Sequence, residues 1–241
     1  MEKVNLEQVD LLFKDLGIKA DERARVLMVE YVNCLIKGMA KSRLTGERTS
    51  LGIIEKQVYD SLYPIRYLKL ERASNLIDLG AGGGLPGIPI KIIRPDLKIT
   101  LLDSNRKKAL FLKETVDALG LEKVMVVNKR AEEIGQELEH REKYSYVFSR
   151  AVAKMAVLAE LALPLLINDG EAVFYKGPGG EDEFEKAEQA IAICGGVLKN
   201  VEHYTLKTGE VRKLYIIKKI KSTPGKYPRK SGMPGKKPIS G

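Results

Sequence analysis

Between residues 73 and 220, short apolar runs alternate with stretches of helical spacing. The runs predict strands at 76–79, 99–102, 124–127, 146–148 and 172–175, and the stretches predict helices near 87–93, 105–119, 130–138, 154–167 and 182–194. Strands that alternate with helices form parallel βαβ units with right-handed crossovers. The pattern therefore predicts an α/β domain built on a parallel sheet.

Two further strands are expected at about 197–206 and 211–219, with no helix between them. The connection Thr208-Gly209-Glu210 is hairpin-like, so this last pair should be antiparallel. The expected sheet thus has seven strands, is mostly parallel, and ends in a C-terminal antiparallel hairpin.

The residues on either side of this domain have different patterns. Residues 1–72 are expected to form a small helical region, in which a polar joint at 42–46 forms a loop and Pro64 ends the third helix. Residues 221–241 form a tail with four prolines and almost no large apolar side chains. Such a tail cannot form a packed core, and we expect it to be extended or disordered without a partner.

The positive charge is concentrated in this tail. The net charge is +9, and residues 218–241 hold eight basic residues and no acid, so the first 217 residues carry only 33 − 32 = +1. This distribution favours a polyanion such as RNA as partner, although it is also compatible with a solvated tail that only aids solubility. The candidate RNA contacts are Lys226, Tyr227, Arg229, Lys230, Lys236 and Lys237, with the Tyr227 ring offered to unpaired bases.

The composition excludes several classes of protein. Cys34 and Cys194 lie far apart, so no disulfide framework or Cys-rich zinc site is expected, and both are interpreted as buried structural thiols. His140 and His203 form no pair with metal-ligand spacing, and no metal is predicted. No apolar stretch approaches about 18 residues, and the N-terminus lacks a secretory layout. We expect a cytoplasmic protein without a membrane span.

The strongest local signal is the loop Asp78-Leu79-Gly80-Ala81-Gly82-Gly83-Gly84-Leu85-Pro86-Gly87, which follows a strand and opens a helix. Its glycines satisfy both the dinucleotide pattern G-x-G-x-x-G and the D-x-G-x-G-x-G pattern typical of S-adenosylmethionine loops. Asp103 ends the second strand, where a carboxylate can accept hydrogen bonds from ribose hydroxyls. The loop therefore predicts an adenosyl ligand.

Three features favour S-adenosylmethionine over a dinucleotide: about 75 preceding residues of helical pattern, Asp78 two residues before the first loop glycine, and the antiparallel hairpin. The fold predicted is a Rossmann-like class I methyltransferase, with Asp78, Gly80, Gly82 and Gly84 toward the cofactor. An NAD-dependent oxidoreductase and a non-enzymic RNA-binding ribosome assembly factor stay open as alternatives.

The end of the fourth strand bears on the kind of methyl transfer. It reads Phe148-Ser149-Arg150-Ala151-Val152-Ala153 and lacks the Asp/Asn-Pro-Pro-aromatic motif of enzymes that methylate exocyclic amines. Neither cysteine ends a central strand, as a carbon-5 pyrimidine methyltransferase requires. A purine ring nitrogen already carries a lone pair and can attack the methyl group directly, so no catalytic residue needs to be assigned.

Several segments resemble the RsmG family, also called glucose-inhibited division protein B. The loop 80–89 is similar to its Gly-Ala-Gly-x-Gly-Phe-Pro-Gly-x-Pro. Further resemblances are Tyr59-Asp60-Ser61-Leu62, Arg130-Ala131-Glu132-Glu133, Ser149-Arg150-Ala151-Val152-Ala153 and the tail element Lys226-Tyr227-Pro228-Arg229-Lys230-Ser231-Gly232-Met233-Pro234. The order of these segments is preserved over nearly the whole chain.

The resemblance implies an S-adenosylmethionine-dependent methyltransferase that modifies guanine N7 in small-subunit (16S) ribosomal RNA, either free or in a 30S particle. It implies that Gly80 and Leu85 contact the cofactor, that Ala131 and Glu132 lie by the adenine, and that Arg150 reaches the cofactor-side pocket. Lys176, after the fifth strand, is expected where substrate enters. Leu85 stands where the family often has Phe, which weakens any expectation of ring stacking there.

Overall fold

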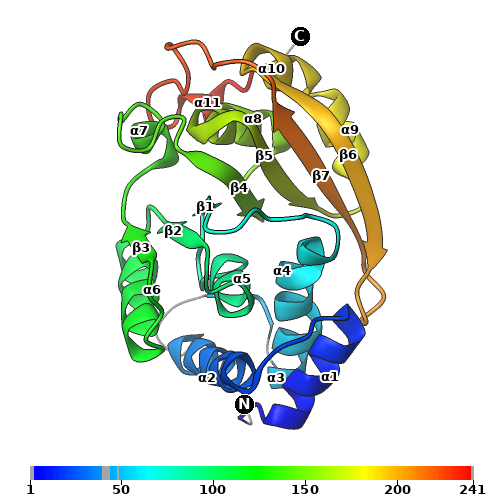
Figure 1. The fold of residues 1–241 in the computed structure, drawn as a ribbon. Helices are drawn as coiled ribbons and strands as arrows, with labels where there is room; N and C mark the ends of the chain where they lie inside the picture. The colour runs from blue at the N-terminus through cyan, green and yellow to red at the C-terminus, as the bar shows by residue number, and fades with distance from the viewer. Residues whose placement is uncertain (1–2, 40–43, 48, 240–241) are drawn as a thin grey trace.

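The computed structural model describes residues 3–39, 44–47 and 49–239. A seven-stranded sheet of order β3-β2-β1-β4-β5-β7-β6 forms its centre (Figure 1). The strands are β1 (Asn75–Leu79), β2 (Lys98–Leu102), β3 (Val124–Val127), β4 (Tyr144–Arg150), β5 (Leu166–Lys176), β6 (Gly196–Thr205) and β7 (Val211–Lys219). The first five strands are parallel, whereas β7 pairs antiparallel with both β5 and β6. The expected α/β fold with a C-terminal antiparallel hairpin is confirmed.

Helices cover both faces of the sheet. They are α1 (Leu6–Leu16), α2 (Glu22–Met39), α3 (Ser50–Gly52), α4 (Tyr59–Leu62), α5 (Gly87–Ile93), α6 (Arg106–Ala118), α7 (Ala131–Ile134), α8 (Met155–Ala162), α9 (Gly180–Glu185), α10 (Glu188–Ile193) and α11 (Met233–Lys236). A π-helical turn η1 (Ile53–Val58) joins α3 to α4, and 3-10 turns η2 (Tyr63–Arg66) and η3 (Leu163–Leu165) follow α4 and α8. None of the described helices is long and apolar enough to cross a membrane.

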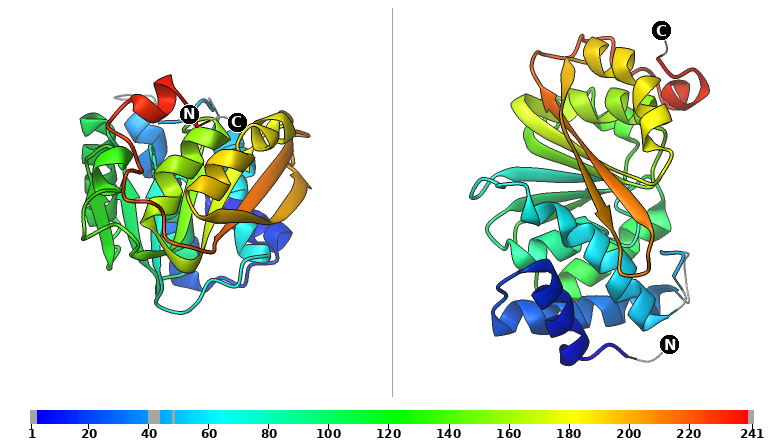
Figure 2. Two further views of the ribbon diagram at one scale, coloured as in Figure 1. Left: turned by 90° about the horizontal axis from the view of Figure 1, so that it is seen from above. Right: turned by 90° about the vertical axis from the view of Figure 1, so that its right-hand side faces the viewer.

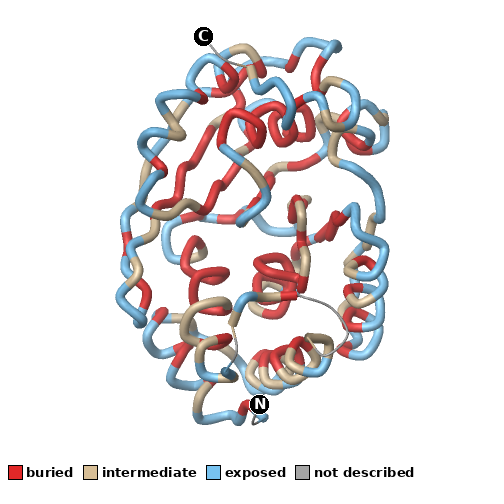
Figure 3. Tube along the Cα trace, turned by 180° about the vertical axis from the view of Figure 1, so that it is seen from behind, coloured by how far each residue is buried: buried red, intermediate tan, exposed pale blue. Residues whose placement is uncertain are grey.

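Alternating side chains of the strands divide the core into two layers. Leu76 of β1 and Phe148 of β4 face the layer that contains α1, α2, α4, α5 and α6, while Ile77 and Val147 face the layer of α8 and α10. The right-hand view of Figure 2 shows the N-terminal helices on one side of the sheet and α8–α10 on the other. In Figure 3 the central strands are buried between outer layers whose solvent faces are exposed. The N-terminal helices thus share a core with the sheet.

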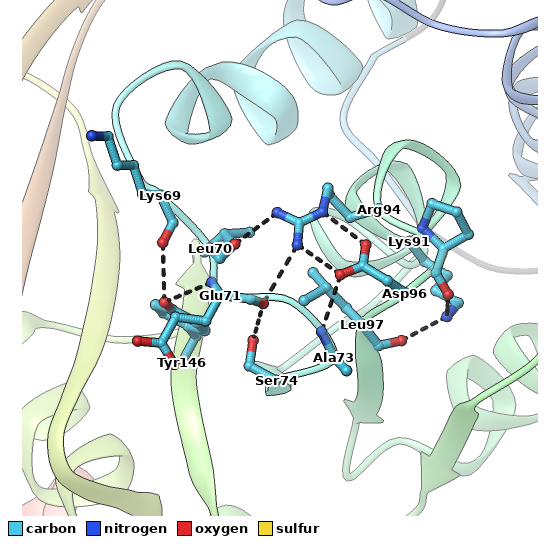
Figure 4. A network of polar contacts seen from close by, with 11 residues as sticks. Lys69, Leu70, Glu71, Ala73, Ser74, Lys91, Arg94, Asp96, Leu97 and Tyr146 are labelled. Carbon is cyan, nitrogen blue, oxygen red and sulfur yellow. Dashed lines mark hydrogen bonds and ion pairs between the residues drawn. The ribbon is translucent and has the colours of Figure 1, made fainter.

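The segment between η2 and β1 is fixed by Arg94 (Figure 4). Its guanidinium donates to the Leu70 carbonyl at 3.0 Å and to both oxygens of Asp96 at 2.7 and 2.8 Å. Asp96 in turn accepts from the Ala73 amide at 3.1 Å, and Arg94 holds the pKa of Asp96 well below its ordinary value. This network joins the helical region to the amino-terminal edge of the sheet.

Three expected helices differ from the structure. The helix expected near 182–194 is two short helices, α9 and α10. The helix expected near 154–167 ends earlier, because Pro164 lies in η3 and the chain enters β5 at Leu166. The helix expected near 130–138 is the single turn α7. Of the loop expected at 42–46, residues 42 and 43 lie outside the described residues. Cys194 is buried as expected, whereas Cys34 is half-buried on α2.

The expectation that the tail has no packed structure is wrong for the described residues 221–239. The Tyr227 ring is only 9 % exposed and joins the core beside α8. Arg141 donates to the carbonyls of Thr223 and Tyr227 at 2.8 and 2.7 Å, and Arg229 pairs with the fully buried Glu160 of α8. The tail has few apolar residues, but polar groups of the domain satisfy its backbone, which makes docking possible.

Candidate active site

A cavity of about 700 Å³ lies at the carboxyl ends of β1, β4 and β5. The chain leaves β1 toward β2 on one side, and β4 lies on the other side, so the strand order reverses here. Open α/β sheets bind ligands at such a switch point. Three segments supply most of the wall: the loop from Gly80 to Leu85, residues 150–154 after β4, and residues 175–177 after β5. The N-terminal region closes the cavity with Thr45, Lys56, Gln57 and Asp60, among others.

The glycine loop is folded tightly against the sheet. The amides of Gly80 and Ala81 both donate to the Leu102 carbonyl at 2.9 Å, and Gly80, Gly82 and Gly84 have φ angles of +80°, +57° and +92°. Residues that carry a side chain rarely adopt such backbone angles. A Cβ on Gly80 would also lie 2.4 Å from Cγ2 of Val152, which also lines the cavity. The glycines therefore let the backbone itself form the floor of the cavity.

Asp103 holds this loop in place. Its Oδ2 accepts from the Gly82 amide at 2.9 Å, and its Oδ1 accepts from the Asn105 amide at 2.8 Å. Asn105 caps α6 by accepting from the Lys107 and Lys108 amides, so Asp103 is not the cap. Each carboxylate oxygen keeps a further lone pair, which suits a diol ligand.

Asp78 lies beneath the loop and is fully buried. Its Oδ2 accepts from the Gly87 amide at 2.7 Å, and its Oδ1 has no hydrogen-bond partner among the described residues. Burial raises the pKa of this carboxyl to about 7, while the Gly87 amide and Arg150 act in the opposite direction. An unpaired buried acceptor at this place is consistent with a polar ligand group.

Arg150 lines the cavity at the end of β4, where a cofactor-side residue was expected. Its Nη1 donates to the Gln57 carbonyl at 3.1 Å and to Asp60 Oδ2 at 3.0 Å, and its Nη2 donates to Gln57 Oε1 at 2.7 Å. Lys176 also lines the cavity, held by the Ala153 carbonyl at 2.8 Å and Glu183 at 2.6 Å. The structure thus brings Gly80, Gly82, Leu85, Arg150 and Lys176 together.

Other expected site residues lie elsewhere. Asp78, Gly84 and Asp103 are not among the residues that line this cavity, although Asp78 and Asp103 accept hydrogen bonds from the Gly87 and Gly82 amides. Ala131 and Glu132 begin α7, also outside the lining. Glu132 Oε1 accepts from the Gly232 amide of the tail at 2.8 Å. The start of α7 is therefore joined to the tail.

The tail presents only part of its expected RNA surface. Tyr227 is buried and the Arg229 guanidinium is paired with Glu160, which is at odds with the expected exposed ring and free cation. The exposed cations of the tail are Lys221, Lys226, Lys230, Lys236 and Lys237. Sequence reasoning missed four cations of the cavity lining, namely Lys56, Lys108, Lys154 and Arg212, because they come from separate segments without a shared motif.

Residues 25–214 match the family model of rRNA small subunit methyltransferase G. The chain belongs to the rRNA small subunit methyltransferase G family. It is 42% identical over 228 residues to the ribosomal RNA small subunit methyltransferase G of Desulforamulus reducens, covering 94% of this chain and 95% of that one. Identity to the Bacillus velezensis protein of the same name is 38% over 239 residues, covering 99% of this chain and all of that one.

A solved structure supports the fold independently of this family. The crystal structure of M. jannaschii TYW2 in complex with AdoMet is similar with a TM-score of 0.56 at 16% identity, covering 73% of this chain and 80% of that chain. At that identity the likeness concerns the fold alone.

Proposed function

We propose that this member of the rRNA small subunit methyltransferase G family transfers the methyl group of S-adenosylmethionine to N7 of a guanine in 16S ribosomal RNA. The observation that carries the proposal is the cavity at the β1/β4 switch point, with the glycine loop on one side and Arg150 and Lys176 on the other. A dinucleotide is the weaker alternative, since the antiparallel β6–β7 hairpin and the family both favour the methyl donor.

The residues present fit S-adenosylmethionine. The open backbone of Gly80 and Gly82 and the side chain of Leu85 would hold it, with Asp103 on the ribose and the unpaired Oδ1 of Asp78 toward its methionine end. Gly84 shapes the loop, Ala131 and Glu132 would flank the adenine, and Arg150 would close the opposite wall. When bound, the cofactor supplies an electrophilic methyl group on a sulfonium.

The chain's own contribution to transfer is positioning. Guanine N7 carries a lone pair in the plane of the ring, so the protein needs to remove no proton from it. In-line orientation of the methyl donor and the guanine supplies up to about 7–11 kcal/mol in favourable cases. Arg150 and Lys176 are fixed by hydrogen bonds before substrate arrives, which lets them act on the substrate without reorganisation.

RNA contact is proposed for Lys176 at the cavity and for the tail lysines. Lys226, Lys230, Lys236 and Lys237 are exposed on a docked tail, so their side chains start from a backbone that is held against the domain. Phosphate contacts by such cations release counterions from RNA. With free 16S RNA or a 30S particle as its substrate, the protein would act in the cytoplasm.

The test is methyl transfer from S-adenosylmethionine to small subunits and free 16S RNA from a strain that lacks the modification, followed by mass mapping of the modified base. We expect one N7-methylguanosine per RNA molecule. RNA binding without any methyl transfer would point to a non-enzymic assembly factor. Thermal stabilisation by NADH but not by S-adenosylhomocysteine would point to an oxidoreductase.

A further inference from the structure

The N-terminal helical region reaches the cavity through one buried carboxylate. Asp60 lies on α4 and is only 5 % exposed. Its Oδ2 accepts from Nη1 of Arg150 at 3.0 Å, and its Oδ1 accepts from the Tyr204 hydroxyl of β6 at 2.5 Å. One side chain thus joins the helical region, the end of β4 and the antiparallel hairpin.

Gln57, one turn earlier in η1, also holds Arg150. Asp60 and Gln57 together are called the Arg150 clamp below. Both its backbone carbonyl and its Oε1 accept from Arg150. The same segment is fixed to the sheet, because the Tyr175 hydroxyl of β5 donates to the Ser61 carbonyl at 3.1 Å and Tyr63 stacks on Tyr204 at 3.7 Å between ring centroids. The acceptors that hold Arg150 therefore sit on a rigid support.

The clamp leaves some N–H donors of Arg150 unused. A guanidinium has five N–H donors, and three are used on Asp60 and Gln57. The Nε hydrogen and one Nη2 hydrogen have no partner among the described residues, and the side chain lines the cavity with 13 % of its surface exposed. A flexible arginine would lose side-chain entropy on binding a ligand, but a clamped one has already lost it.

We propose that Asp60, assisted by Gln57, is a positioning residue that presents the two unused donors of Arg150 to an acceptor group of the methyl donor in the cavity. This inference rests on the proposed function, since it needs that ligand in this cavity. In this proposal Asp60 acts on the ligand through Arg150 and not by direct contact.

The experiment compares Asp60→Asn with Tyr204→Phe in the full chain. Asn keeps an oxygen for Tyr204 but turns an amide N–H toward Arg150, whereas Tyr204→Phe removes the other bond of the same carboxylate. We expect Asp60→Asn to weaken S-adenosylhomocysteine, measured by calorimetry, about tenfold or more, as for loss of one charged hydrogen bond. Tyr204→Phe should lower the melting temperature and change the Kd less than about twofold.

A second arm separates positioning from a general loss of structure. In an Arg150→Met background, adding Asp60→Asn should change the Kd less than about twofold, because the group through which Asp60 acts is gone. Gln57→Ala, at a half-buried position, should weaken binding about threefold or more and replaces Asp60→Asn if that variant does not fold.

The outcomes are distinguishable. Equal affinity of wild type and Asp60→Asn, equal losses in Asp60→Asn and Tyr204→Phe, or additive effects with Arg150→Met would each overturn the positioning role while leaving the proposed function intact. A wild-type chain that does not bind S-adenosylhomocysteine at all would overturn the proposed function, and this inference with it.

Discussion

Among single residues, Asp78 gives the stability a dependence on pH between about pH 4 and pH 7. Its pKa of about 7 in the folded chain compares with 3.8 in an unfolded one, because burial disfavours the charged carboxylate. Between these values the folded chain binds more protons than the unfolded chain. The stability contribution of Asp78 is therefore fully present below about pH 4 and is lost as the pH rises to about 7, with a total of up to about 4 kcal/mol.

Asp78→Asn should remove this dependence, since the amide oxygen can still accept from the Gly87 amide and never ionises. We expect the free energy of unfolding of the variant, relative to wild type, to rise between pH 4 and pH 8 in urea titrations. A difference between the two proteins that stays constant over this range would show that Asp78 is not a buried acid of raised pKa.

Gly80 tests the backbone floor of the cavity. Gly80→Ala combines a φ of +80° with a Cβ 2.4 Å from Val152, so we expect a stability loss of about 1–3 kcal/mol and at least about tenfold weaker binding of S-adenosylhomocysteine. Gly209→Ala is the matched control, because Gly209 has a φ of +90° but no neighbour within 4 Å. Gly209→Ala should lower the free energy of unfolding and leave the affinity for S-adenosylhomocysteine unchanged. Equal ligand affinity in both variants would contradict the assigned cavity.

At the scale of elements, a buried ion pair joins the tail to α8. Glu160 on α8 has no exposed side-chain surface, and Arg229 meets it with Nε at 2.8 Å and Nη2 at 2.6 Å. A buried carboxylate without its partner costs far more than a surface pair is worth.

Arg229→Met should therefore lower the free energy of unfolding by about 3–5 kcal/mol in denaturant titrations. Lys221→Met makes the same charge change at an exposed position of the tail and should cost less than about 0.5 kcal/mol. Restoration of most of the lost stability by Glu160→Gln in the Arg229→Met background would support the buried-charge explanation, and similar losses in the two single variants would contradict it.

Periodicity and turn chemistry predict the sheet well, because each strand is a local signal. The strand 124–127 and the hairpin around Gly209 agree with β3 and with the β6–β7 connection. The docked tail could not be predicted, since Tyr227 and Arg229 find their polar partners at Arg141 and Glu160, far away in the sequence. The contact of Asp60 with Arg150 could not be predicted for the same reason, because the sequence around Asp60 gives no local sign of its partner.

At the scale of the whole molecule, the position of charge matters more than its sum. Substituting Lys226, Lys230, Lys236 and Lys237 by Gln should lower the slope of log K against log salt for RNA binding by up to about 3. The same substitution of Lys69, Lys98, Lys123 and Lys143, exposed near the amino ends of the strands, should leave the slope unchanged. Equal changes in both variants would mean that net charge alone attracts RNA.

The central claim is that the cavity between the glycine loop and Arg150 holds the methyl donor. The most direct measurement is a crystal structure of the chain soaked with S-adenosylhomocysteine. The account predicts its sulfur in this cavity between Gly80 and Arg150, and its ribose beyond the cavity lining, next to the glycine loop and within hydrogen-bond distance of Asp103. Density for the ligand at any other place, with this cavity filled only by solvent, would contradict the account.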